Sequence, residues 1–309
     1  MARNVRSPAV AGQFYEADPQ VLAHQIEGCF TSPRGPGQLP PHHRSDSRRI
    51  RAAVVPHAGY PYSGPIAAHA YYAIGAEREP ATVLILGVDH FGHGVPFSLS
   101  NQPWETPLGP VEVDHELAEA LHRGPIEIDE PTHAAEHSIE VQLPFLQYVL
   151  ARPRFVALMI RYSPYAELQR IAEIVRKAID GRDVLLLAST DFSHYISAAD
   201  ADRLDHLAIN EILRRDAHGL YRVVDKNAIS MCGIAPTTVL LAAVTGEDLA
   251  ARLLRWGHSG EEAPMREVVG YGSLLLEAPG PSTMAKTAPS AAAPDTDLSF
   301  DNDPGSFVR

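Results

Sequence analysis

The stretch "VVPHAGYPYSG", residues 54–64, joins the end of an apolar run to a histidine and then to a group of turn-forming residues. The run that leads into it, "IRAAVV" (50–55), is typical of a buried strand, and "GPIAAHAYYAIG" (64–75) has the pattern of a helix. This order of strand, turn and helix is the first half of a βαβ unit. His57 therefore lies at the carboxyl end of a strand, where open α/β sheets usually hold their ligands.

Short apolar runs alternate with helical patterns along the rest of the chain. Continuous Val, Leu and Ile runs are typical of parallel strands that helices cover on both faces. We therefore predict a single α/β domain with a central, mostly parallel sheet flanked by helices, and antiparallel C-terminal strands at one side. Strands are predicted at 50–55, "TVLILGV" (82–88), "RFVALMI" (154–160), "DVLLLAS" (183–189), "ARLLRWGHSG" (251–260) and "REVVGYGSLLLEA" (266–278), and helices near 64–76, 114–122, 137–150, 165–180 and 198–214.

Two segments have the composition of irregular chain. Residues 31–49 are rich in Pro, Gly and charge, which indicates an exposed loop between an N-terminal helix and the first core strand. Large apolar residues are too few after Pro279 to offset the entropy of ordering. We therefore expect residues 1–278 to form the domain and residues 279–309, rich in Pro, Ala, Ser and Asp, to form a disordered tail.

Composition and charge limit the expected partners. The chain has 309 residues, 45% of them hydrophobic, and a formal net charge of −12. Nucleic acids and anionic membranes bind clustered Lys and Arg, so we expect neither as a partner. No apolar run is long enough to span a bilayer and the first residues do not resemble a secretion signal, which favours a cytoplasmic protein. Cys29 and Cys232 are far apart in sequence, so each is expected to be a free thiol or a ligand.

The arrangement of a strand followed by histidine recurs in the chain. "TVLILGVDHFGHG" places Asp89 and His90 directly after a strand, and "DVLLLASTDFSHY" places Asp191 and His194 directly after another. The carboxyl ends of parallel strands lie along one edge of a sheet, so these residues and His57 can converge. This edge is the predicted functional site.

Cys232, in "SMCGIAP" (230–236), is a further candidate ligand. It precedes Gly233 and a predicted helix with Pro236 near its first turn. The N–H groups at a helix N-terminus stabilise negative charge, which favours a thiolate. Two imidazoles and a thiolate would suit copper, iron or zinc rather than magnesium or calcium, which prefer oxygen ligands.

Simpler interpretations exist for each residue taken alone. A single histidine is more often a surface or hydrogen-bonded structural residue than a ligand, and a single cysteine such as Cys232 is more often a small buried apolar residue. Asp191 could cap the turn after its strand. Glu136, His137 and Glu140, in "THAAEHSIEVQLPFLQYVL", could solvate the beginning of a helix. Histidines that recur in the same topological position favour the site over these alternatives.

A series of longer motifs extends in order over nearly the whole chain, up to about residue 277. They are "RSPAVAGQFYEADP", "PHAGYPYSG", "LGVDHFG", "WETPLGPVEVD", "EHSIEVQLPFLQY", "STDFSHY", "MCGIAP" and "VVGYGSL". On these motifs the chain resembles the Memo family, whose microbial members are called AmmeMemoRadiSam system protein B. Several of the motifs are long and idiosyncratic, which makes the resemblance specific.

The resemblance implies a fold and a set of site residues. Memo proteins are similar in fold to the class III extradiol, LigB-like dioxygenases, which hold non-haem iron on two histidines and one carboxylate. By this resemblance His57 and His90 correspond to the histidine ligands and Cys232 replaces the carboxylate. His194 corresponds to the acid–base histidine of the dioxygenases, and Asp191 lies beside it. The thiolate changes metal preference and redox potential, so the ring-opening reaction is not carried over with the fold.

The resemblance leaves several functions open. Memo proteins have been associated with copper or iron and with redox behaviour, and the animal members with phosphotyrosine peptides and cell motility. The microbial members neighbour radical SAM and AMMECR1-like proteins, which are possible partners. The first hypothesis is a metal-dependent redox or dioxygenase-like enzyme with one iron or copper ion per chain, zinc being less favoured, that acts on an unknown small molecule or peptide. The alternatives are a non-catalytic peptide- or metabolite-binding module and a copper or iron carrier.

Overall fold

The computed structural model describes residues 4–280 of the chain. Up to Pro279 the described residues form one compact α/β unit with a mixed, mostly parallel central sheet, which confirms the predicted fold class. The similarity to the LigB-like dioxygenase fold stays a prediction. So does the domain boundary at residue 278, because the tail predicted for 279–309 lies outside the described residues except for its first two.

The centre of the sheet consists of parallel strands in the spatial order β1 (Ile50–Val55), β8 (Val184–Ser189), β2 (Thr82–Val88) and β7 (Arg154–Ile160). Every residue of β2 and of β8 is buried. These strands therefore have both faces covered, which explains why they read as continuous apolar runs rather than as an alternation of apolar and polar residues.

Further strands extend the sheet on both sides. Next to β1 lie β11 (Val268–Glu277) and then β10 (Ala250–His258), each antiparallel to its neighbour, as predicted. Next to β7 lies the antiparallel strand β3 (Phe97–Ser100). The shorter strands are β6 (Glu127–Ile128) beside β3, β5 (Gly109–Val113) beside β7, β4 (Trp104–Thr106) beside β5, and β9 (His194–Ile196) beside β11.

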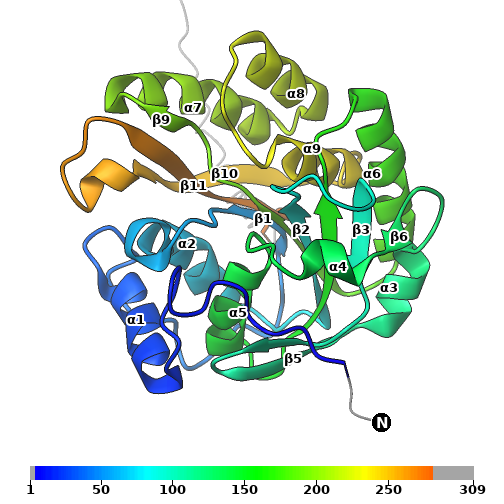
Figure 1. Ribbon diagram of the computed structural model, residues 1–309, viewed down its shortest axis with the longest axis horizontal. Coiled ribbons are helices and arrows are strands. Elements are labelled where there is room, and N and C mark those ends of the chain that lie inside the picture. Colours follow the sequence, from blue (N-terminus) through cyan, green and yellow to red (C-terminus); the bar gives the residue numbers. More distant parts are fainter. Residues whose placement is uncertain (1–3, 281–309) are drawn as a thin grey trace, which may run out of the picture. The chain divides into compact units, whose positions relative to one another are not determined.

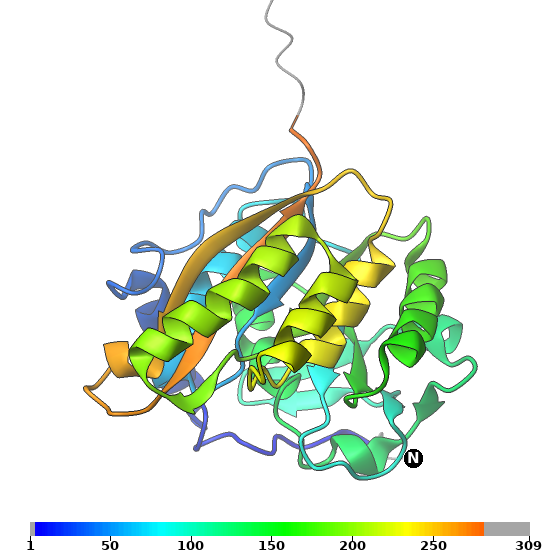
Figure 2. The same cartoon turned by 90° about the horizontal axis from the view of Figure 1, so that it is seen from above.

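Helices cover both faces of the sheet, as Figures 1 and 2 show. One layer contains α1 (Pro19–Thr31), α2 (Tyr60–Gly75) and α5 (Leu143–Val149), which contact one another. The other contains α6 (Tyr165–Ile179), α7 (Ala198–Arg214), α8 (Ala217–Lys226) and α9 (Ile234–Ala243). The short helices α3 (His115–Leu121) and α4 (Glu130–His133) lie toward β7 and β3.

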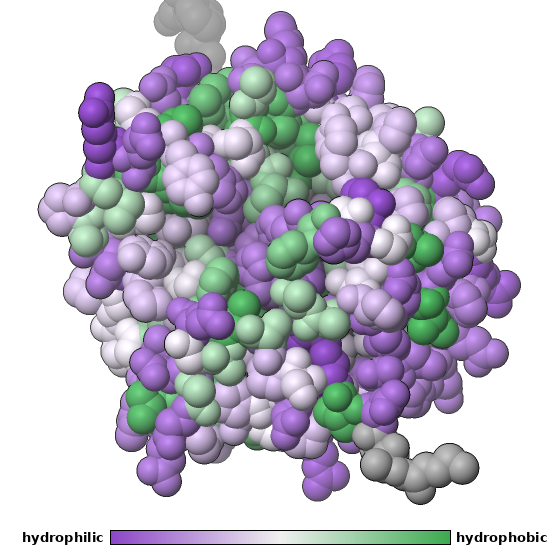
Figure 3. All heavy atoms as spheres, viewed as in Figure 1, coloured by the Kyte–Doolittle hydropathy of each residue, from purple (hydrophilic) through white to green (hydrophobic). Residues whose placement is uncertain are grey.

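One face of the molecule carries mostly hydrophilic residues (Figure 3). Figure 3 shows hydrophilic residues over most of one face, with apolar residues in small scattered groups, which is usual for a surface in contact with water. Within residues 4–280, no helix has both the length and the apolar character needed to cross a bilayer.

The helix predicted near 137–150 is shorter in the structure. A 3₁₀ turn (Glu140–Gln142) leads into α5, and Pro144 is near the first position of that helix. The backbone N–H groups of His137 and Ser138 donate to the side chain of Glu136 instead of entering a helix. The carboxylate therefore competes with helix formation, an effect that apolar periodicity does not reveal.

His133, the last residue of α4, is a buried histidine. Its side chain is 0% exposed and packs edge-on against Trp104, with ring centroids 5.6 Å apart. Burial, and then the positive charge of Arg6, lowers the pKa of His133 to about 3. The folded protein therefore keeps this imidazole neutral at pH values at which the unfolded chain is protonated.

We expect His133 to make the fold sensitive to acid. Because its pKa is lower in the folded state, the unfolded state gains a proton first as the pH falls below about 6.5, and the free energy of unfolding decreases by about 1.4 kcal/mol per pH unit. Urea unfolding at about pH 7 and about pH 5 should show that the wild type loses roughly 2 kcal/mol more than His133→Phe does. His42→Phe, in an exposed loop, is the control. Equal pH dependence in wild type and His133→Phe would contradict this account.

Candidate metal centre

The ends of three neighbouring strands supply the first side chains of the site. His57, Asp191 and His90 are each the second residue beyond a strand, after β1, β8 and β2 respectively. Since β8 lies between β1 and β2 and all run parallel, these positions meet at one edge of the sheet. The predicted convergence of His57 and His90 is therefore present in the structure.

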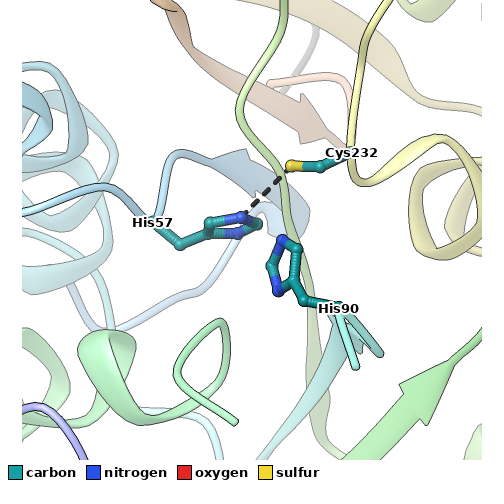
Figure 4. A group of neighbouring side chains, drawn as sticks. All are labelled: His57, His90 and Cys232. Atoms are coloured by element: carbon teal, nitrogen blue, oxygen red, sulfur yellow. Dashed lines mark hydrogen bonds between the residues drawn. The ribbon is translucent and has the colours of Figure 1, made fainter. Parts of the chain in front are cut away.

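Cys232 completes the cluster from the loop before α9. The thiol Sγ lies 3.2 Å from Nε2 of His57, and the ring of His90 faces the same point (Figure 4). One ligand atom from each of His57, His90 and Cys232 lies within 4.8 Å of the others. The rings of His57 and His90 are nearly perpendicular, at 87°, with centroids 5.2 Å apart.

The tautomer of His57 follows from its contact with Ser189. The Ser189 hydroxyl donates to the carbonyl of Ser138 at 2.6 Å and accepts from Nε2 of Gln142 at 2.8 Å. Because the Ser189 hydroxyl has already donated its only proton, it must accept the hydrogen bond from Nδ1 of His57, 2.9 Å away. The lone pair of His57 is then on Nε2, toward Cys232. Burial also lowers the pKa of His57, which keeps the ring neutral.

The tautomer of His90 follows from a buried carboxylate. Nδ1 of His90 lies 3.0 Å from Oε1 of Glu136, which leaves its Nε2 for the centre. Burial by itself would raise the pKa of Glu136, but the hydrogen bond and charge of His90 lower it well below its usual range. Burial alone would lower the pKa of His90, but the hydrogen bond to Glu136 and its charge raise it, and the net effect is a raised pKa.

The prediction that Cys232 is a thiolate is wrong for the metal-free protein. Burial, and then the charge of Asp191, raises the pKa of the Cys232 thiol, so the thiol stays protonated at neutral pH. The amide of Asp191 donates to Sγ at 3.2 Å, but this contact and the start of α9 do not offset burial. The thiol can donate to Nε2 of His57, and a cation at this point would replace that proton.

Asp191 and His194 lie beside the cluster but do not form the predicted close pair. Oδ1 of Asp191 accepts from the backbone N–H of His57 at 2.8 Å, and burial raises the pKa of Asp191 to about 6. Nδ1 of His194 lies 2.8 Å from the carbonyl of Phe192 and 2.9 Å from that of Ser230. Carbonyls only accept, so His194 carries its proton on Nδ1, and these carbonyls orient its ring.

Two other candidates from the sequence lie outside the cluster. Asp89 forms an ion pair with Arg161, with Nε and Oδ2 2.7 Å apart, and so holds the loop after β2. Cys29, on α1, is buried with its thiol 3.9 Å from the carbonyl of Tyr60, and burial raises its pKa to about 12. Neither residue belongs to the candidate centre.

His137 is a site residue that the sequence reasoning missed. Its ring stacks on that of His90, with centroids 4.7 Å apart and an angle of 14°, and lies edge-on to His57 at 5.5 Å. His90, Glu136 and His137 form a second group whose ligand atoms lie within 4.8 Å of one another. The adjacent Glu and His in "EHSIE" were a signal, but the segment was interpreted as the solvated beginning of a helix.

The donor set fits a single transition-metal ion. The imidazoles of His57 and His90 are held with their Nε2 atoms toward the thiol, and the neutral ring of His57 is a base beside that thiol. The carboxylates of Asp191 and Glu136 add negative charge around the same point, which favours a cation. Two nitrogens and one sulfur suit copper, iron or zinc.

Comparison with known proteins gives consistent matches. The family model described as Memo-like protein matches residues 6–275. A MEMO1 family protein of Methanothermobacter thermautotrophicus is 42% identical over 278 residues, which cover 87% of this chain and 99% of the relative. One of Sulfolobus acidocaldarius is 42% identical over 281 residues, covering 87% and 98%. A solved structure of an uncharacterized Escherichia coli K12 protein covers 72% of this chain and 99% of its own, with 12% identity and a TM-score of 0.47, too weak a similarity to support any conclusion.

Gly233 allows Cys232 to approach β8 closely. A Cβ atom at residue 233 would lie 2.2 Å from Cβ of Thr190 and 2.7 Å from the carbonyl oxygen of Ser189, so the loop or the strand end would have to move. We expect Gly233→Ala to reduce the free energy of unfolding by about 1–3 kcal/mol and to displace Cys232, so that a maleimide alkylates its thiol faster.

Gly28→Ala is the matched control, because a Cβ there meets nothing within 4 Å. It lies within α1, so the change should be neutral or stabilise by up to about 1 kcal/mol. Thermal unfolding and mass spectrometry of the alkylated protein measure both effects. Unchanged stability and unchanged Cys232 alkylation in Gly233→Ala would show that the close approach does not position the thiol.

Proposed function

The chain belongs to the Memo family, and on that premise we propose that it is a metal-dependent redox enzyme in which His57, His90 and Cys232 hold one iron or copper ion. The observation that supports this most directly is the meeting of two imidazoles and a thiol within 4.8 Å, on the edge of the sheet where ligands bind. The dioxygenase-like character of the site is part of the proposal.

The choice of metal follows from the donors and the reaction class. Two imidazoles and a thiolate suit iron, copper and zinc, and a redox reaction requires an ion that changes its oxidation state, which zinc does not. A bound iron or copper ion would supply electron transfer and polarisation of a substrate. Cys232 would lose its proton on binding, and the carboxylates nearby would balance the positive charge.

His194 is the residue best placed to move protons. Its Nδ1 proton is engaged by the carbonyls of Phe192 and Ser230, so Nε2 is free to accept a proton from a substrate. The ring is part-exposed, unlike the buried ring of His57, so substrate and solvent can reach it. Asp191, charged above about pH 6, would place a negative charge beside the site of proton transfer.

This set of residues favours an enzyme over a carrier or a binding module. A metal carrier requires only the residues that coordinate the metal, and a peptide-binding groove requires no metal-coordinating residues. Neither requires a buried carboxylate and an oriented imidazole beside the ion. We therefore place the enzyme first, acting on a small molecule or peptide.

Metal content and oxygen consumption test the proposal directly. We expect about one iron or copper ion per chain in protein loaded anaerobically with Fe²⁺ or Cu⁺, since the donor set suits either ion. Oxygen uptake with a panel of catechols and thiols should depend on the ion, and protein freed of metal by a chelator is the control. Bound metal without turnover would support the carrier, and absence of metal binding would support the binding module.

Single substitutions should separate ligands from proton-transfer residues. His57→Ala and Cys232→Ala should lose the metal, because each removes a coordinate bond. His194→Ala should keep the metal while turnover falls by roughly 10²–10⁴-fold, as expected for loss of general acid–base catalysis. Asp191→Ala should have a smaller effect on turnover. Metal analysis beside oxygen uptake measures each variant, and loss of metal in His194→Ala as complete as in Cys232→Ala would make His194 a ligand.

A further inference from the structure

Glu136 is a fully buried carboxylate directly behind His90. Its side chain is 0% exposed. It accepts from the backbone N–H of His90 at 3.0 Å, from Nδ1 of His90 at 3.0 Å, from the N–H of His137 at 2.8 Å and from that of Ser138 at 2.9 Å. All these partners are N–H donors, so the carboxylate needs no proton of its own.

The contacts of Glu136 hold His90 at two points. The carboxylate binds the main chain of His90 through Oε2 and its ring through Oε1, so both the position and the rotation of the imidazole are restricted. Since a carboxylate accepts, Nδ1 of the neutral His90 ring keeps the proton and Nε2 keeps the lone pair. Figure 4 shows that this ring points toward His57 and Cys232.

His137 restricts His90 from a second direction. Its main-chain N–H donates to the same carboxylate, and its ring stacks on His90 at an angle of 14°. Phe14 packs against His137 in turn, with ring centroids 4.7 Å apart. The ring of His90 is therefore packed against an imidazole that is itself held in place.

We propose that Glu136 is a positioning residue of the metal centre: it holds His90 with Nε2 toward the ion and increases the negative charge on that nitrogen through the hydrogen bond to Nδ1. This rests on the proposed metal centre at His57, His90 and Cys232. A carboxylate behind a ligand histidine strengthens the ligand and stabilises a more highly charged ion. Glu136 thus contributes to metal affinity without touching the metal.

The chain supplies a matched control four residues further on. Glu140 is also 0% exposed, but it binds Arg6 at 2.7 Å and the hydroxyl of Tyr15 at 2.6 Å. It also accepts from the N–H groups of Ala9 and Val10. Glu140 therefore anchors the N-terminal segment and has no contact with His90 among these partners. Replacing either residue with Gln removes one buried carboxylate.

The experiment compares Glu136→Gln with Glu140→Gln, with Co²⁺ as the probe. Both oxygens of Glu136 accept hydrogen bonds from N–H groups. In either orientation, the NH₂ group of a Gln at this position would face N–H groups, so hydrogen bonds to His90 or its neighbours are lost. Competition with a chelator should show Co²⁺ binding about 10–100-fold weaker in Glu136→Gln. Glu140→Gln should bind Co²⁺ within about threefold of wild type, even though its melting temperature falls. Equal weakening in both variants, or none in Glu136→Gln, would overturn the proposal.

A measurement on metal-free protein keeps the test independent of the metal. At a pH above the pKa of His90, long-range ¹H–¹⁵N NMR should find His90 of the wild type with its proton on Nδ1, and Glu136→Ala should give a mixture of tautomers. An unchanged His90 tautomer in Glu136→Ala would overturn the positioning role. If the wild type binds no Co²⁺, the proposed function fails while this measurement still tests Glu136. Two Co²⁺ ions per wild-type chain, with one lost in Glu136→Gln, would make Glu136 a ligand and also overturn the proposal.

Discussion

The parallel pairing of β1, β8 and β2 is the constraint on which the rest of the site depends. Because the strands are in register, residues at the same distance beyond each strand reach the same edge, and this places His57, Asp191 and His90 side by side. Every residue of β8 and β2 is buried, so the ends of these strands cannot shift without disturbing the core. Cys232 then needs only a close approach to β8, which Gly233 allows.

The site contains several buried polar groups, and each of them would reduce the stability of the fold if it had no partner. Glu136 is stabilised by N–H donors and by His90, and Asp191 by the N–H of His57. The Cys232 thiol, by contrast, keeps its proton because burial and Asp191 oppose a second negative charge. A region of this kind is not arranged for maximal stability of the metal-free chain, and a cation would relieve the repulsion between its acidic groups.

The sequence was informative wherever one strong local signal decided the structure. Buried strands read as apolar runs, and the histidines that follow them could be placed at one edge before any coordinates were known. Short strands such as β4 and β6 have no such signal, because their pairing depends on neighbours distant in sequence. The role of Glu136 depends on His90, which is 46 residues away. The protonation state of the Cys232 thiol depends on its burial and on the charge of Asp191. Its position before a helix, taken alone, led to the wrong prediction of a thiolate.

The loop that carries Cys232 also determines when the centre can exist during synthesis of the chain. His57 and Cys232 are separated by 175 residues, so the histidine emerges from the ribosome long before the cysteine is synthesised. Until α9 docks on the sheet, His57 and His90 have no sulfur partner, and the thiol is an ordinary exposed side chain of a nascent polypeptide. An ion held by all three proposed ligands could therefore bind only after the segment that carries Cys232 has been synthesised and α9 has packed against the sheet.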